Sequence, residues 1–356
     1  MKIGIFDPYL DTLGGGEKYI LTIAMCLAKL HNIFIFWDPK SEKEIKETAH
    51  KKLDIDLTSV QFTQNIFSPK YSSFSRLILS KNYDFIIFLS DGSIPFVLSK
   101  LIIHFQFPVE WVNISPLITK FKLLRIQKII CNSVFTKSFI DKKFGINSTV
   151  LYPPVFIQKK NIKKENIILH VGRFGINVEG VNYKKQDIMV EVFKKMIKGG
   201  LRDWKFVLFI NSKKEDQGEL DKLKERAKGF PIEIIDNADN ALLWEFYNKS
   251  KIYWHASGFG EDLGKYPEKA EHFGIATVEA MGAGCVPVVI NAGGQKEIVE
   301  NEKSGFLWNT IDELIEKTNK IMKDHSLWKK MSENAIIKSS YFTGDRFCQE
   351  LTGLVT

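Results

Sequence analysis

The sequence has no apolar stretch long enough to cross a membrane. Its longest run without Asp, Glu, Lys or Arg is sixteen residues, Ala280–Gln295, and it contains four glycines and a proline. A spanning helix needs about 20 consecutive apolar residues. The opening residues Met1–Glu17 also lack a signal-peptide pattern, because acidic residues and glycines interrupt them before any apolar region develops. We therefore expect a cytoplasmic protein.

Cysteine is scarce, and the common metal and dinucleotide signatures are missing. The four cysteines show no C-x-x-C spacing and no His/Cys cluster, so we expect four reduced thiols. The one D-x-D, Asp54-Ile55-Asp56, has no acidic partner, and we interpret it as chance, so no metal site is expected. No G-x-G-x-x-G occurs, which removes the best evidence for a nicotinamide dehydrogenase.

Positive charge is in modest excess, and most of the excess lies in the first half. The chain has 50 Lys and Arg against 42 Asp and Glu, a net charge of +8. A basic first half could face anionic lipid headgroups or a phosphorylated substrate. Residues Pro116–Ile130 mix Leu, Ile and Phe with four basic residues, which suits an amphipathic helix on the inner face of a membrane. A helix of an ordinary soluble domain is the alternative. No nucleic-acid module is recognisable.

Short apolar runs alternate with helix-period segments on both sides of a proline pair. Lys2–Phe6 and Phe85–Leu89 precede Tyr152-Pro153-Pro154, and the pattern restarts at Ile167–Val171. Uniformly apolar strands alternating with helices predict parallel sheets covered on both faces, hence an α/β fold with two doubly wound, Rossmann-like domains facing a cleft. We place the domains at 1–153 and 154–338, and we expect a tail, 339–356, to return to the first. Ligands of such domains gather at the carboxyl ends of the strands.

The strongest local signal surrounds a glycine turn before a predicted helix. Glu271 precedes Gly274, the helix begins at about Ile275, and Glu279 lies more than a turn inside it. Open backbone N–H groups at a helix start bind anions, and a glycine lets a phosphate approach closely. Glu279 could accept two hydrogen bonds from a ribose diol. A nucleoside diphosphate suits this segment, although a helix start with dipole-complementing acids is the alternative.

Two further segments carry residues suited to an anionic ligand. Arg173 follows a predicted strand, and Lys184 and Lys185 precede a predicted helix, so these cations could stabilise a departing diphosphate. Gly14-Gly15-Gly16 opens a helix after the first strand, and either a phosphate contact or a plain turn explains it. His104 ends a predicted strand and, taken alone, is more typical of a packed core histidine.

Taken together, these motifs resemble glycosyltransferase family 4, the retaining, metal-independent enzymes of the GT-B fold. The resemblance runs nearly end to end, and its most specific part is Glu271-x7-Glu279 with the following Ala-Met-Gly-Ala-Gly284. Supporting motifs are Gly172-Arg173-Phe174 and Ala292-Gly293-Gly294-Gln295. The segment Glu271-His-Phe-Gly-Ile275 is similar to sequences of the mannosyltransferases of lipid-linked oligosaccharide assembly, and this similarity slightly favours GDP-mannose as the donor.

The resemblance implies the roles of individual residues. Arg173 and Lys185 would hold the donor diphosphate, with Lys184 as the alternate lysine, while Glu279 would bind the ribose and Glu271 the donor sugar. His104 would contact that sugar or the incoming hydroxyl. The remaining residues expected at the donor are Gly15, Gly16, Phe273, Gly274 and Ile275.

The implied activity is transfer of a hexose, with mannose as one candidate, from a GDP- or UDP-sugar to a glycan or lipid-linked acceptor, without a further cofactor. Three alternatives remain: a GT-B sugar-nucleotide epimerase, a Rossmann-type oxidoreductase, and a nucleotide-sugar-binding protein without catalysis. The loop Gly258–Pro267 is long for the family and is interpreted as a mobile lid.

Overall fold

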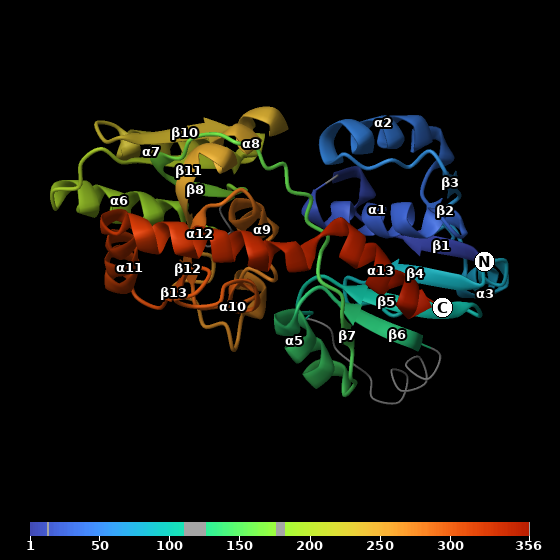
Figure 1. Cartoon of the computed structure of the whole chain (residues 1–356). Helices are drawn as coiled ribbons and strands as arrows, with labels where there is room; N and C mark the ends of the chain where they lie inside the picture. Colours follow the sequence, from blue (N-terminus) through green and yellow to red (C-terminus); the bar gives the residue numbers. More distant parts are fainter. Residues whose placement is uncertain (13, 110–125, 176–181, 356) are drawn as a thin grey trace. The chain divides into compact units, whose positions relative to one another are not determined.

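The computed structural model describes residues 1–12, 14–109, 126–175 and 182–355, which form two compact units (Figure 1). Unit 1 comprises residues 1–154 and 344–356, and unit 2 comprises residues 155–343. The boundaries predicted from the sequence lie after residues 153 and 338.

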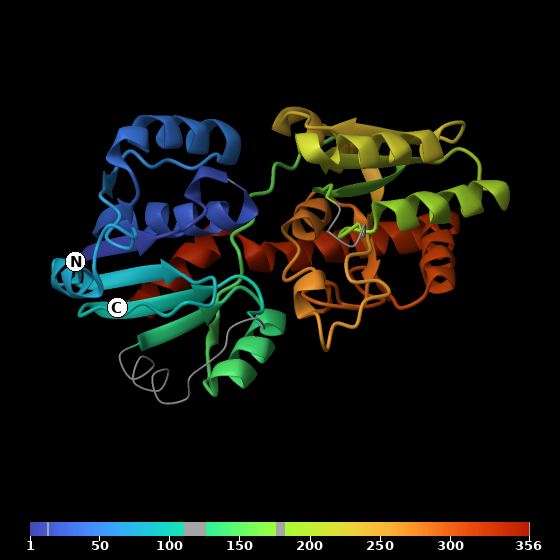
Figure 2. The same cartoon turned by 180° about the vertical axis from the view of Figure 1, so that it is seen from behind.

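Unit 1 is built on a seven-stranded sheet in the order β3-β2-β1-β4-β5-β6-β7, and every neighbouring pair is parallel. Its helices lie on both sides of the sheet (Figure 1, Figure 2). The strands are β1 (Lys2–Phe6), β2 (Asn32–Phe36), β3 (Val60–Thr63), β4 (Phe85–Leu89), β5 (Lys100–Phe105), β6 (Ile126–Cys131) and β7 (Thr149–Val150). The helices are α1 (Gly15–Ala28), α2 (Glu42–Leu53), α3 (Ser73–Ser80), α5 (Val134–Phe144) and α13 (Gly344–Val355).

Unit 2 repeats this plan with a six-stranded parallel sheet in the order β10-β9-β8-β11-β12-β13. The strands are β8 (Glu165–Arg173), β9 (Lys205–Asn211), β10 (Ile232–Asp236), β11 (Ser250–His255), β12 (Val286–Ile290) and β13 (Phe306–Trp308). The helices are α6 (Gln186–Lys198), α7 (Gln217–Ala227), α8 (Asn240–Lys249), α9 (Ile275–Gly282), α10 (Gln295–Ile298), α11 (Ile311–Lys323) and α12 (His325–Ser339). The predicted α/β fold class is therefore confirmed.

The central strands are apolar along their length because helices cover both faces of each sheet. All five residues of β4 and all five of β12 are buried. A strand that faced water on one side would instead alternate apolar and polar residues. Since the strands are parallel, their carboxyl ends share one edge of each sheet, and that edge carries the residues discussed below.

The prediction of an amphipathic helix over Pro116–Ile130 is wrong for its last residues, and the rest of that segment lies outside the described residues. Residues 116–125 are not described, and Ile126–Ile130 belong to the strand β6. The D-x-D also has a local explanation, because Asp54 ends α2 in a left-handed conformation and Asp56 accepts a hydrogen bond from the Thr58 amide. None of the described helices is both long and apolar enough to cross a membrane.

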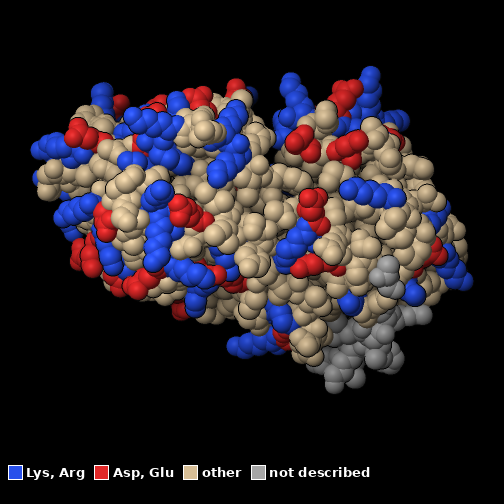
Figure 3. Space-filling view, viewed as in Figure 1, with Lys and Arg blue, Asp and Glu red and all other residues tan. Residues whose placement is uncertain are grey.

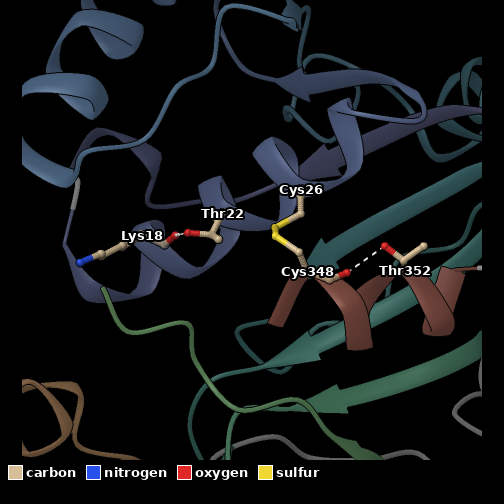
Figure 4. Close-up of a disulfide and its surroundings, with 5 residues drawn as sticks. All are labelled: Lys18, Thr22, Cys26, Cys348 and Thr352. Carbon is tan, nitrogen blue, oxygen red and sulfur yellow. Dashed lines mark hydrogen bonds between the residues drawn. A yellow bond between two sulfur atoms is a disulfide. The ribbon is translucent and has the colours of Figure 1, made fainter. Parts of the chain in front are cut away.

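The chain's last helix is joined to its first by a disulfide, so the expectation of four reduced thiols is wrong for two of them. Cys26 of α1 and Cys348 of α13 are bonded, while Cys131 and Cys285 are free and buried (Figure 4). Phe347, Leu351 and Val355 of α13 also enter the core of unit 1. No spacing rule could find this pair, because 322 residues separate the two cysteines and only the fold brings them together.

We expect reduction of this disulfide to destabilise unit 1. A native disulfide typically contributes about 2–4 kcal/mol to the free energy of unfolding. Dithiothreitol should therefore lower the melting temperature of the wild-type protein but not that of a Cys26→Ser/Cys348→Ser double variant, which should already melt at the lower temperature. Equal melting temperatures for the wild-type protein with and without reductant would contradict this.

Candidate functional site

Two glycine turns of unit 2 pack against each other at the start of α9. Gly274, the residue before α9, has φ +116°, which strains any residue with a Cβ, and a Cβ there would lie 2.5 Å from Gln295 Nε2. Gly294 donates its N–H to the Glu271 carbonyl at 2.8 Å, and a Cβ on Gly294 would lie 2.5 Å from the Phe273 Cα. The Gly293-Gly294 motif therefore shapes the turn from Glu271 to Gly274.

The structure begins α9 at Ile275, where the sequence predicts it. The N-cap residue Gly274 has no side chain that could cap the helix, and among the described residues the first intrahelical bonds run from Thr277 and Val278 to the Gly274 carbonyl, so the amides of Ile275 and Ala276 precede them. Uncapped N–H groups at a helix start attract anions. Phe273 is buried and contacts the ring of Phe342, so it supports the turn.

The Glu271 carboxylate is held by two donors that come from different elements. Its Oε2 accepts hydrogen bonds from Lys184 Nζ at 2.7 Å and from His255 Nε2 at 2.9 Å. Burial raises the pKa of this carboxyl, but the Lys184 charge and the His255 hydrogen bond act against it, and the net pKa lies well below its usual value. Glu271 is therefore ionised at neutral pH.

The neighbouring lysine is paired with a residue of the long loop between β11 and α9. Lys185 Nζ contacts Glu261 Oε1 at 2.6 Å, and Lys269 Nζ contacts Glu261 Oε2 at 3.0 Å. The hydrogen bond from Lys185 is the main cause that lowers the pKa of Glu261. Lys184 and Lys185 thus each pair with a different acid of this loop, and the two pairs fasten it to the start of α6.

Arg173 and Glu279 lie on other elements of the same unit. Arg173 is the exposed last residue of β8, and its carbonyl accepts a hydrogen bond from Gln186 in the first turn of α6. Glu279 lies in the second turn of α9, where Oε2 accepts a hydrogen bond from the buried Tyr247 hydroxyl at 3.0 Å. The end of β8, the start of α6, and α9 with the turn before it thus carry all the residues of unit 2 that the sequence predicts at the donor.

The predicted residues of unit 1 have well-defined internal contacts. The Gly14 N–H donates to the Glu17 carboxylate, which caps α1, and a Cβ on Gly16 would lie 2.4 Å from Gln106 Oε1. Gly15 is the first residue of α1. His104 is buried and stacked on Tyr19 with ring centroids 4.2 Å apart, and burial lowers its pKa to about 3. These contacts give the glycine loop and His104 packing roles, and their predicted ligand contacts remain predictions.

Four residues of interest escaped the sequence analysis: His255, Tyr247, Glu261 and Asp7. His255 ends a buried strand, and His104 lies one residue before the end of another, so this position was the available signal. Glu261 lies in a loop whose path the sequence does not reveal. Within the described residues, no group of three or more His, Cys, Asp or Glu side chains is placed to hold a metal ion.

Comparison with known proteins gives a consistent picture. A family model described as glycosyl transferases group 1 matches residues 154–338. The chain is 25% identical to the alpha-1,3/1,6-mannosyltransferase ALG2 of Dictyostelium discoideum, over all of this chain and 98% of that protein. It is also 25% identical to the GDP-Man:Man(3)GlcNAc(2)-PP-Dol alpha-1,2-mannosyltransferase of the same organism, over 98% of this chain and 83% of that protein.

Solved structures share the fold at lower identity. A glycosyltransferase from Rickettsia africae superposes with a TM-score of 0.75 at 18% identity, over all of this chain and 98% of the other. Anabaena HepE in complex with UDP superposes with a TM-score of 0.73 at 16% identity, over all of this chain and 99% of the other. These likenesses establish the two-unit fold.

Asp7 should make the stability of the protein depend on pH. It follows β1, is 1% exposed, and burial raises its pKa to about 7, with Glu17 and Asp11 adding to the rise and the Tyr9 amide opposing it. The unfolded chain binds this proton less tightly, so the stabilisation is complete below the unfolded pKa of about 4 and is lost as the pH rises through 7.

The substitution Asp7→Asn, which cannot ionise, should therefore stabilise the protein relative to wild type by about 3 kcal/mol more at pH 8 than at pH 5. Urea unfolding at both pH values measures this difference. Asp345→Asn, at an exposed position of unit 1, serves as the control and should show no such change. If Asp7→Asn has the same effect at both pH values, Asp7 is not a buried acid of raised pKa.

Proposed function

Because the chain belongs to the group 1 glycosyl transferases and is a glycosyltransferase, we propose that it transfers mannose from GDP-mannose to a lipid-linked saccharide, with retention of configuration and without a metal ion. The observation that carries the proposal is the end-to-end similarity to two mannosyltransferases, one of them named for a GDP-mannose donor and a dolichyl-diphosphate-linked acceptor. We assign the donor to unit 2 and the acceptor to unit 1.

The geometry of unit 2 supports a nucleoside diphosphate as the donor's leaving group. The uncapped amides at Ile275 and Ala276 attract anions. Arg173 ends β8, and Lys185 precedes α6, so both lie at the carboxyl edge where such units bind their ligands. Glu279, oriented by Tyr247, offers a carboxylate of the kind that accepts hydrogen bonds from a ribose diol.

These residues suffice for a retaining transfer. The bond between the anomeric carbon and the diphosphate oxygen breaks as negative charge builds up on the diphosphate, and Arg173, Lys185 and the start of α9 stabilise that charge. The acceptor hydroxyl forms its new bond on the same face of the sugar, and its proton passes to the departing diphosphate oxygen. Glu271, ionised and fixed, contacts a hydroxyl of the transferred sugar.

The donor is tested by thermal shift with GDP, UDP and ADP and with their sugars. A ligand that binds only the native state stabilises it by RT ln(1 + [L]/Kd), about 2.7 kcal/mol when its concentration is 100 times Kd. We expect GDP and GDP-mannose to give the largest shifts. Chromatography and mass spectrometry should then show mannose transferred from GDP-mannose to a lipid-linked oligosaccharide.

Three outcomes would overturn parts of this proposal. A larger shift with UDP than with GDP would contradict the donor base. Conversion of the nucleotide-sugar without an acceptor would instead indicate the epimerase alternative. The turnover of Arg173→Ala should be about 10²–10³-fold lower than that of the wild-type protein, which is the loss expected when one donor to the transition state is removed. Near-normal turnover would remove Arg173 from the mechanism.

A patch on unit 1 supports contact with an anionic membrane, where a lipid-linked acceptor would reside. On α3, Phe74 is 72% exposed and Ile78 is 52% exposed, one helical turn apart. Leu98 joins them, because its N–H donates to Ser80 at the end of α3, and Lys81 and Lys100 are exposed nearby in the chain. Apolar side chains beside lysines suit insertion between anionic headgroups.

Exposed charged side chains outside this patch give weaker support for a membrane contact. On the face shown in Figure 3, basic and acidic side chains of the described residues are interspersed. Charge alone therefore does not mark a membrane-binding surface on that face. The proposed contact rests on the combination of Phe74, Ile78 and Leu98 with lysines.

We expect the double variant Phe74→Ser/Ile78→Ser to weaken binding to vesicles of phosphatidylcholine and phosphatidylserine, because it removes the apolar part of the patch. Sedimentation with and without phosphatidylserine measures the bound fraction. The matched control is Ile337→Ser, which removes an exposed apolar side chain from α12 of unit 2. Equal recovery of the wild-type protein in the supernatant with both vesicle types would end the membrane proposal.

A further inference from the structure

One oxygen of Glu271 is fully used by the protein, while the other is left for a ligand. Oε2 accepts both hydrogen bonds, from Lys184 and from His255. Oε1 has no hydrogen-bond partner among the residues that the structure describes. The Glu271 carbonyl is also fixed, because it accepts the Gly294 N–H. Backbone and carboxylate are therefore both held, and Oε1 is the atom that remains for a ligand.

The two donors to Oε2 differ in how firmly they are placed. Lys184 reaches Glu271 through a long side chain, and its ammonium is also attractive to a diphosphate. His255 is the last residue of β11, a central strand between β8 and β12, and it is 2% exposed. Its ring has only two rotatable bonds and is enclosed by the core. His255 is thus the donor that stays in place if Lys184 turns toward a phosphate.

The protonation of His255 follows from its surroundings. Burial lowers its pKa, against the opposing effect of Glu271, so the ring is neutral at neutral pH. A neutral imidazole carries one N–H, and an ionised carboxylate can only accept. The contact at 2.9 Å therefore assigns the hydrogen to Nε2 and leaves Nδ1 bare, and Nδ1 has no partner among the described residues.

We infer that His255 is a positioning residue of the transfer reaction: its Nε2–H fixes Oε2 of Glu271, so that Oε1 is presented to a hydroxyl of the sugar being transferred. The inference rests on the proposed function for the identity of that ligand. It adds a residue that acts through Glu271 and does not itself touch the sugar. A misplaced carboxylate would reduce the stabilisation of the transition state more than the affinity for the nucleotide, because other residues bind the nucleotide.

Two substitutions at the same position separate positioning from packing. His255→Leu fills the space without a donor and should lower kcat about 10–100-fold, since displacement of a positioned group by about 1 Å can cost 10² in rate. The Kd for GDP should change less than about threefold, because the nucleotide contacts lie elsewhere. His255→Gln, whose amide N–H can take the place of Nε2–H, should recover most of the lost kcat.

A second measurement does not depend on turnover. Long-range ¹H–¹⁵N spectra of the wild-type protein, with the His255 signals assigned by their loss in His255→Gln, should show a protonated Nε2 and a bare Nδ1. This result would stand even if no mannose transfer were found, so a failure of the proposed function can be told apart from a failure of the inference.

Several results would overturn the inference. A protonated Nδ1 in the spectra would remove the hydrogen bond on which it depends. Wild-type kcat in His255→Leu would show that Glu271 needs no positioning. If both variants lost kcat equally and had equally lowered melting temperatures, His255 would be a packing residue only.

Discussion

The turn before α9 depends on the way the protein holds Glu271 at both ends of the residue. Its carbonyl accepts a hydrogen bond from the Gly294 N–H, and its carboxylate accepts hydrogen bonds from Lys184 and His255. The first contact fixes the path of the backbone into Gly274 and so determines where the open amides of α9 lie. The second fixes a negative charge on a residue four positions before the first residue of α9. The open amides of α9 and the Glu271 carboxylate are therefore both placed by a single residue.

Two lysine–glutamate pairs balance charge at this part of unit 2. Lys184 and Lys185 are adjacent in sequence, yet each contacts a different acid, Glu271 and Glu261. The paired acids limit the repulsion between the lysines, while Arg173 at the end of β8 remains exposed. A doubly charged diphosphate would enter a region in which its countercharges are already oriented, and such preorganisation is the main source of electrostatic catalysis.

The periodicity of the sequence was sufficient to predict the fold and the positions of the motifs within it. Largely apolar segments such as Phe85–Leu89 and Ile167–Val171 predict buried parallel strands, and the structure contains them. The partners of charged residues could not be predicted, because they depend on loop paths. Glu261 reaches Lys185 across 76 residues, and Cys26 reaches Cys348 across 322. A buried histidine such as His255 is chemically ambiguous until its neighbours are known, since packing and hydrogen bonding both explain it.

The most direct test of the account is a crystal structure of the protein with GDP bound. We predict the diphosphate at the start of α9, with the amides of Ile275 and Ala276 and the side chains of Arg173 and Lys185 within hydrogen-bonding distance, and with Glu271 still bonded to His255. A diphosphate bound away from α9, or a Glu271 carboxylate released from His255 when the nucleotide binds, would contradict it.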